Sequence, residues 1–206
     1  RRWHFGQPTG IELPAESRGL LRPVSSWSRI SLGAISMGQE VALTPLQLTA
    51  ALSAIANGGR WVPPRLVREI VRDRQAEKVS PPPWERILSS EVAEELQRML
   101  TEVVRQGTGQ LAQPQGYSAG GKTGTAQKID ESGSYSRRDF IASFTGFAPV
   151  RHPRITVTVV LDSPPGPLYH GGEVAAPVFR AVVEQTLAYL NVPHDRPLER
   201  TRHTPR

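Results

Sequence analysis

A single lysine belongs to two overlapping motifs in the stretch Gly116-Tyr117-Ser118-Ala119-Gly120-Gly121-Lys122-Thr123-Gly124-Thr125. Residues 116–123 match the phosphate-binding pattern G-x-x-x-x-G-K-[ST] at every fixed position, and residues 122–124 form the tripeptide K-T-G. The two motifs need different structures, because the first is a loop between a buried strand and a helix, whereas the second lies within an exposed strand. The sequence on either side of Lys122 therefore decides between them.

The flanking residues argue against the phosphate-binding loop. Residues 110–115 lack the apolar run of a buried strand, and residues 126–134 lack helical periodicity. Gly124 stands where the helix would have to begin. A nucleotide-binding protein that uses Gly116–Thr123 is therefore kept only as an alternative, which tight binding of ATP would identify.

The K-T-G tripeptide suits a peptide ligand that ends in a carboxylate. Lys122 supplies a fixed positive charge for that carboxylate, and the Thr123 hydroxyl can bond the same group. Gly124 has no side chain, so a substrate backbone can lie against the strand as an added β-strand. The backbone N–H of Thr125 can stabilise an oxyanion. We therefore predict Lys122, Thr123 and Gly124 as substrate-binding residues and Thr125 as an oxyanion-hole donor.

Hydrophobic periodicity outside this stretch predicts an α+β fold, with helices packed on an antiparallel sheet. Helices are predicted over residues 44–57, 90–106 and 174–190, the first with Thr44 as its N-cap. Strands are predicted over 117–127, 140–147 and 154–162, with a hairpin of 65–71 and 77–79 and a short strand near Ile30–Ile35. The last helix is apolar on nearly two faces, so we expect both to be buried.

Composition and charge exclude several classes of protein. The 206 residues carry a net charge of +6, but the arginines usually alternate with acidic residues, so we expect no nucleic-acid partner. The absence of cysteine excludes disulfides and thiolate metal sites, and the five histidines lack metal-ligand spacing, so no metal or cofactor is expected. No apolar run is long enough to span a membrane and no signal peptide is visible, so this chain is expected to carry neither signal nor anchor.

Several further segments, in order along the chain, resemble the class B penicillin-binding proteins, the D,D-transpeptidases that cross-link peptidoglycan. These segments are TGIELP at 9–14, TPLQL at 44–48, ANGG at 56–59, GTG at 107–109, AGGKTGTAQK at 119–128, FTGFAP at 144–149 and GGEVAAPVF at 171–179. K-T-G is the third motif of such enzymes, which usually have one glycine, not two, before the lysine. Residues 171–179 and 189–193 look most like the division-specific branch.

The resemblance implies a fold, ligands and partners. It implies the serine penicillin-recognising transpeptidase fold, with peptidoglycan stem peptides and β-lactams as ligands. It also implies division-machinery partners for the parent protein, and a position at the plasma membrane with this domain on the extracytoplasmic face. His170, in a loop rich in glycine and proline, is predicted to be an exposed loop residue, with a position at the border of the cleft as the alternative.

Two motifs of the family are missing from this sequence. No S-x-x-K nucleophile exists, because Gln75, Ala119 and Thr125 stand three residues before the three lysines, and no asparagine completes S-x-N. Both motifs precede T-G-I-x-L-P in the family, so the resemblance implies that residues 1–192 are the C-terminal portion of a transpeptidase domain. We expect residues 193–206 to be a disordered tail rich in arginine and proline. We expect such a chain to be inactive alone, and a non-catalytic peptidoglycan or divisome binding module is the alternative.

Overall fold

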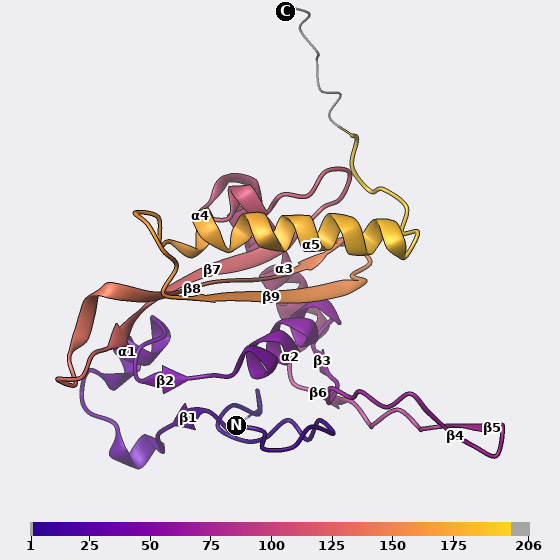
Figure 1. Ribbon diagram of the computed structural model, residues 1–206, viewed down its shortest axis with the longest axis horizontal. Helices are drawn as coiled ribbons and strands as arrows, with labels where there is room; N and C mark the ends of the chain where they lie inside the picture. The colour runs from indigo at the N-terminus through magenta and orange to yellow at the C-terminus, as the bar shows by residue number, and fades with distance from the viewer. Residues whose placement is uncertain (1, 199–206) are drawn as a thin grey trace, which may run out of the picture. The chain divides into compact units, whose positions relative to one another are not determined.

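The computed structural model describes residues 2–198, which form two compact units. The first unit ends at Ala93 and the second begins at Glu94, so helix α3 (Ser90–Gln106) runs through the boundary. The first unit contains β1 (Leu20–Leu21), the 3-10 turn η1 (Val24–Ser26), α1 (Ser31–Ser36), β2 (Val41–Ala42), α2 (Pro45–Ala56), β3 (Arg60–Trp61), β4 (Glu69–Arg72), β5 (Gln75–Lys78) and β6 (Glu85–Arg86). The second contains the 3-10 turn η2 (Gln110–Ala112), β7 (Gly120–Ile129), β8 (Tyr135–Ala148), β9 (Ile155–Asp162), α4 (Gly171–Val174) and α5 (Ala176–Tyr189). Figure 1 labels these elements.

Helix α2 is the best-defined element of the first unit and confirms the helix predicted over 44–57. The Thr44 hydroxyl accepts from the Gln47 backbone N–H at 3.1 Å, and the Gln47 side chain accepts from the Thr44 N–H at 3.0 Å. This reciprocal capping box satisfies two donors that a helix start otherwise leaves unpaired. One small core cluster of the unit consists of Ala54, Trp61 and Ile87.

The short strand expected near Ile30–Ile35 is wrong, because this segment forms helix α1. Its apolar side chains point outward: Ile30 is 74% exposed and Leu32 is 71% exposed. The buried residue is Ser31, whose hydroxyl donates to Glu40 Oε2 at 2.8 Å and accepts from the Ser28 backbone N–H at 3.0 Å. Hydrogen bonds to a serine, not burial of alternating apolar side chains, therefore set this conformation.

An antiparallel sheet in the order β7-β8-β9 forms the second unit. All three predicted strands are confirmed, and β8 is longer than predicted at both ends. The central strand β8 pairs with both neighbours, so β7 is an edge strand of this sheet. The register places Lys122 opposite Thr145 and Thr123 opposite Phe144.

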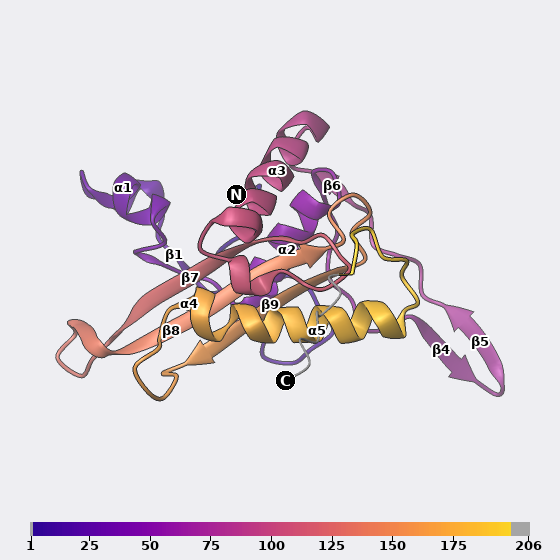
Figure 2. The ribbon, with the colours of Figure 1, turned by 90° about the horizontal axis from the view of Figure 1, so that it is seen from above.

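Helix α5 lies along one face of this sheet, as Figures 1 and 2 show. Phe179 and Leu187 are fully buried there, and the Phe179 ring packs on Phe144 with centroids 4.7 Å apart. The expectation that two faces of this helix are buried is wrong, because Val178 is 42% and Val182 39% exposed. The helix packs on the sheet with one face only. The predicted α+β fold, with helices packed on an antiparallel sheet, is confirmed.

The segment after α5 contacts the turn that leads into β7. The Asp195 carboxylate accepts from the Ser118 backbone N–H at 2.6 Å, and the Asp195 and Arg196 N–H groups both donate to Gly116 O at 3.1 Å. The Tyr117 hydroxyl donates to Val192 O at 3.0 Å. Residues 199–206, the greater part of the tail predicted at 193–206, lie outside the described residues.

Candidate functional site

Lys122, Thr123, Gly124 and Thr125 follow one another on the edge strand β7. The chain stays extended through Ile129, so the helix that a phosphate-binding loop requires after its lysine does not form. The extended backbone thus agrees with the flanking sequence, which lacks the helix of a phosphate-binding loop. Because β8 pairs with one side of β7, and no other strand of the described residues pairs with β7, the other edge is open to strand addition.

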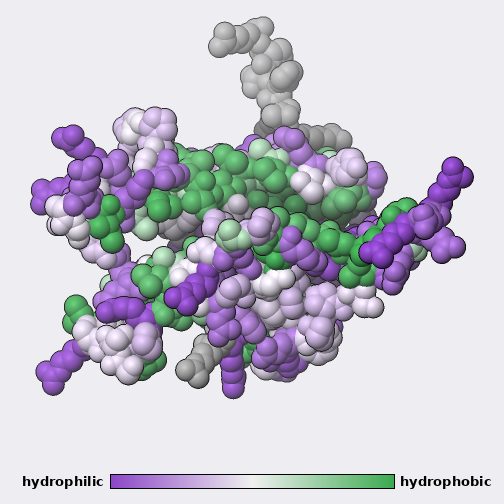
Figure 3. All heavy atoms as spheres, turned by 60° about the horizontal axis from the view of Figure 1, so that its bottom comes forward, coloured by the Kyte–Doolittle hydropathy of each residue, from purple (hydrophilic) through white to green (hydrophobic). Residues whose placement is uncertain are grey.

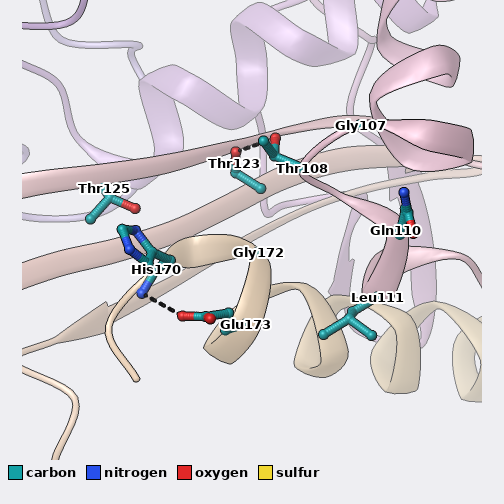
Figure 4. Close-up of a pocket in the computed structure, with 9 residues that line it drawn as sticks. All are labelled: Gly107, Thr108, Gln110, Leu111, Thr123, Thr125, His170, Gly172 and Glu173. Carbon is teal, nitrogen blue, oxygen red and sulfur yellow. Dashed lines mark hydrogen bonds between the residues drawn. The ribbon is translucent and has the colours of Figure 1, made fainter. Parts of the chain in front are cut away.

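A pocket of about 420 Å³ lies beside this strand (Figure 4). Alternate residues of a strand share one face, so Thr123 and Thr125 both face the pocket. The remaining wall comes from the turn after α3 and from the start of α4. The lining residues are Gly107, Thr108, Gln110, Leu111, Thr123, Thr125, His170, Gly172 and Glu173.

Hydrogen bonds join the K-T-G strand to both walls of the pocket. The Thr123 and Thr108 hydroxyl oxygens are 2.9 Å apart, within hydrogen-bonding distance. The Lys122 ammonium donates to Thr123 Oγ1 at 3.2 Å and to the Thr123 carbonyl at 3.1 Å. The Gly171 backbone N–H donates to the Thr125 hydroxyl at 3.1 Å. Two threonine hydroxyls at the pocket are therefore held by the protein itself.

Glycines allow α4 to approach the strand this closely. A Cβ atom at Gly172 would lie 2.2 Å from the Thr108 carbonyl oxygen, and one at Gly171 would lie 2.1 Å from the Ser143 carbonyl oxygen. Both distances are shorter than any non-bonded contact that a side chain tolerates, so only glycine fits. A Cβ atom at Gly124 would lie 2.5 Å from Ser143 Oγ, so this glycine also makes room for a neighbouring hydroxyl.

The charges of the site leave a cation uncompensated. Lys122 is exposed and forms no ion pair with any of residues 2–198. Lys128, near the other end of the strand, pairs with Asp162 at 2.8 Å, and this bond raises the pKa of Lys128 and lowers the pKa of Asp162. The carboxylate among the pocket residues belongs to Glu173, which caps the start of α4. A lysine with no ion pair in this range, bonded to the Thr123 hydroxyl, suits an anionic ligand.

The sequence predicted part of this arrangement and missed part of it. Thr123 and Thr125 line the pocket, but the sequence predicts a role only for the backbone N–H of Thr125 and none for its hydroxyl. In the sequence, Thr108 stands out only as part of a family segment, although its hydroxyl pairs with that of Thr123. His170 is exposed, as predicted, and also lines the pocket. The glycines on both sides of Thr108 were the available signal, since they indicate a turn that approaches other backbone.

Within the described range, 2–198, no cluster of three or more histidine, aspartate or glutamate side chains is arranged to hold a metal ion. In the same range, no helix has the length and hydrophobicity needed to cross a bilayer.

The strand-borne K-T-G motif and the α+β fold match a known class of proteins. Residues 1–184 match the family model described as the penicillin-binding protein transpeptidase domain. Stage V sporulation protein D of Bacillus subtilis is 39% identical over 191 residues, which are 91% of this chain and 29% of that protein. Penicillin-binding protein PbpB of Mycobacterium tuberculosis is 36% identical over 203 residues, which are 94% of this chain and 30% of that protein.

Solved structures agree with this match. The crystal structure of penicillin-binding protein 3 of Mycobacterium tuberculosis complexed with aztreonam has a TM-score of 0.86 and 34% identity, over 96% of this chain and 46% of that one. The transpeptidase domain of Burkholderia pseudomallei penicillin-binding protein 3 has a TM-score of 0.83 and 38% identity, over 95% and 57% of the respective chains.

The chain belongs to the penicillin-binding protein transpeptidase domain family. The predicted membership in the class B penicillin-binding proteins is confirmed. The chain spans less than a third of the length of the two curated relatives named above.

Proposed function

We propose that this chain provides the carboxylate-binding strand of a peptidoglycan D,D-transpeptidase. The observation that carries the proposal is a lysine that has no ion pair among residues 2–198 and that bonds the pocket-lining Thr123 on an edge strand. In this proposal Lys122 and Thr123 bind the terminal carboxylate of a stem peptide or a β-lactam. Gly124 lets the ligand backbone approach the strand, and the Thr125 N–H contributes to the oxyanion hole.

The nucleophile of the reaction must come from outside this sequence. No S-x-x-K or S-x-N motif is present, although these motifs supply the attacking serine and its activating groups in the family. We therefore propose that an acyl-enzyme forms on a serine of a longer parent protein and that residues 1–206 alone do not acylate. We further propose that the parent acts in division, at the extracytoplasmic face of the plasma membrane.

Labelling of membranes with fluorescent penicillin tests this proposal. Membranes of the organism that encodes the chain would be labelled, and the same gel would be probed with an antibody against this segment. We expect a labelled band much heavier than 22.6 kDa that the antibody also recognises. An unlabelled band at 22.6 kDa would contradict the proposal and support a non-catalytic binding module, the alternative that the missing nucleophile favours.

A substitution at Lys122 tests the assigned role directly. In the labelled protein, Lys122→Ala should lower the second-order rate constant for acylation by about 10–100-fold, since a hydrogen bond to a charged group contributes about 1.5–3 kcal/mol. Lys78→Ala is the matched control, because Lys78 is exposed on strand β5 of the other unit. Equal acylation rate constants for the two variants would contradict the role of Lys122 in binding the carboxylate.

A further inference from the structure

We infer that Thr108 is a positioning residue that fixes the direction in which the Thr123 hydroxyl donates, so that the pocket selects a carboxylate over a neutral amide. This inference rests on the proposed function, since it concerns how the same pocket distinguishes ligands. Thr108 lies outside the K-T-G motif, 14 residues earlier in the chain, in the turn after α3. Figure 4 shows its side chain next to that of Thr123, joined by a dashed line.

The Thr123 hydroxyl can form only a limited number of hydrogen bonds. A hydroxyl oxygen accepts two hydrogen bonds and donates one. One acceptor position is taken by the Lys122 ammonium, which can only donate, at 3.2 Å. If Thr108 donates to the second position at 2.9 Å, both lone pairs of Thr123 Oγ1 are occupied. The hydroxyl can then act only as a donor, and its proton is left for a ligand.

The environment of Thr108 supports this direction of donation. The Thr108 and Thr123 hydroxyls are close enough for either to donate, and we assign the donor role to Thr108. The turn that carries Thr108 is fixed, because the Gly107 and Gly109 N–H groups donate to Val103 O at 3.1 and 3.0 Å. Gly172 lies close against the Thr108 carbonyl. The donor is therefore held in place before any ligand arrives.

Thr125 completes a surface made of donors. Its hydroxyl oxygen accepts from the Gly171 N–H at 3.1 Å, and its own proton remains available to the pocket. Two hydroxyl protons are then available at the pocket, and the Lys122 ammonium, bonded to Thr123 Oγ1, adds a positive charge beside them. A carboxylate only accepts hydrogen bonds, so it satisfies all three. The NH₂ group of a carboxamide would place donor against donor, which leaves polar groups unpaired and weakens binding.

An NMR titration of the ¹⁵N-labelled 206-residue chain tests the inference. The two probes are N-acetyl-D-alanyl-D-alanine and the same dipeptide with a C-terminal carboxamide, and the readout is the ratio of their dissociation constants from shifts at residues 122–125. We expect the native chain to prefer the carboxylate, and Thr108→Val to reduce this preference by about tenfold, the effect of roughly one hydrogen bond to a charged group. Thr108→Ser keeps the hydroxyl and should keep the preference.

Controls separate positioning from general damage. Thr101→Val is the matched control, because the Thr101 hydroxyl donates to Gln97 O within α3 and is not among the pocket-lining residues. A purely structural role would weaken both probes equally and leave the ratio unchanged. An unchanged ratio in Thr108→Val, or an equal loss in Thr108→Ser, would overturn the role of Thr108 alone. A native chain that binds neither probe, or both equally, would overturn the carboxylate site itself and this inference with it.

Discussion

Two antiparallel hairpins of this chain, β7–β8 and β4–β5, share a backbone pattern but differ in what covers them. The β7–β8 pair belongs to a three-stranded sheet whose central strand contains the fully buried Phe144 and Phe147. The β4–β5 pair forms a two-stranded sheet of its own, and all eight of its strand residues are exposed. Hydrogen-bonded pairing is thus common to both, whereas a hydrophobic core supports only the first.

The difference explains where the candidate site lies. An isolated two-stranded hairpin is at best marginally stable, because ladder hydrogen bonds mostly replace bonds to water. A binding site needs side chains held within fractions of an ångström, which requires packing behind the strand that carries them. Thr123 and Thr125 meet this condition because β7 pairs with β8, and Phe144 of β8 packs against Phe179 of α5.

The largest expected effect is on stability, and it appears when valine is replaced by alanine in the sheet unit but not when the same change is made in the hairpin. Val183→Ala in α5 empties a fully buried position and should lower the free energy of unfolding by about 2–3 kcal/mol. Val71→Ala removes a side chain that is 62% exposed on β4, so we expect a loss below about 1 kcal/mol. Urea unfolding followed by circular dichroism gives both values. Equal losses would mean that the hairpin is packed as tightly as the sheet.

A second contrast concerns glycines with and without space around them. Gly172→Ala places a Cβ against the Thr108 carbonyl, so we expect a loss of about 1–3 kcal/mol together with weaker ligand binding, because the turn that carries Thr108 must move. At Gly33 in α1 no atom lies within 4 Å of an added Cβ, so Gly33→Ala should be neutral or slightly stabilising. Thermal unfolding and the dipeptide titration measure both effects. A Gly172→Ala protein with native stability and native binding would show that the approach of α4 is not needed.

The sequence predicted the elements whose side-chain pattern matches their burial. Helix α2 has a capping signal at Thr44 and a buried apolar face, and both are visible locally. Helix α1 could not be predicted in this way, because its apolar residues are exposed and its buried residue is Ser31. The outer face of α5 was misjudged for a related reason, since Val178 is apolar and yet no element of its own unit covers it completely. Apolar character alone does not tell which face finds a partner.

In the candidate site too, some residues can be predicted from a local pattern and others cannot. Lys122–Thr125 are consecutive residues, so a local motif was enough to select them. Thr108 and His170 reach the same pocket only through the folding of the sheet and α4, from positions 14 residues before and 48 residues after Lys122. No periodicity links them to the motif. Their role depends on close backbone approaches, which become visible in sequence only as unexplained glycines.

The smallest expected effect is electrostatic and follows from a charge pair on the sheet. Because Lys128 lowers the pKa of Asp162, the folded state favours the ionised carboxyl. The stabilisation it contributes is present above the pKa of an unfolded-state aspartate and is lost as the pH falls through the lowered pKa of the folded protein. The pKa of Lys128 is raised, so the stability that its charged form contributes is lost at the alkaline end, as the pH rises through the pKa of Lys128 in the folded protein. At neutral pH the pair is therefore fully charged.

Urea midpoints measured from neutral pH down to about pH 2 test this linkage. Asp162→Asn should be slightly less stable than the native chain at neutral pH, and the two should converge as the acid protonates Asp162. Glu69→Gln on the hairpin is the matched control, because Glu69 forms no ion pair with any of residues 2–198. Its difference from the native chain should stay near zero throughout. A pH-independent difference for Asp162→Asn would mean that the carboxylate acts through its shape and the hydrogen bond that it accepts from Ser163, not through its charge. In that case the sheet and the hairpin would differ in packing alone.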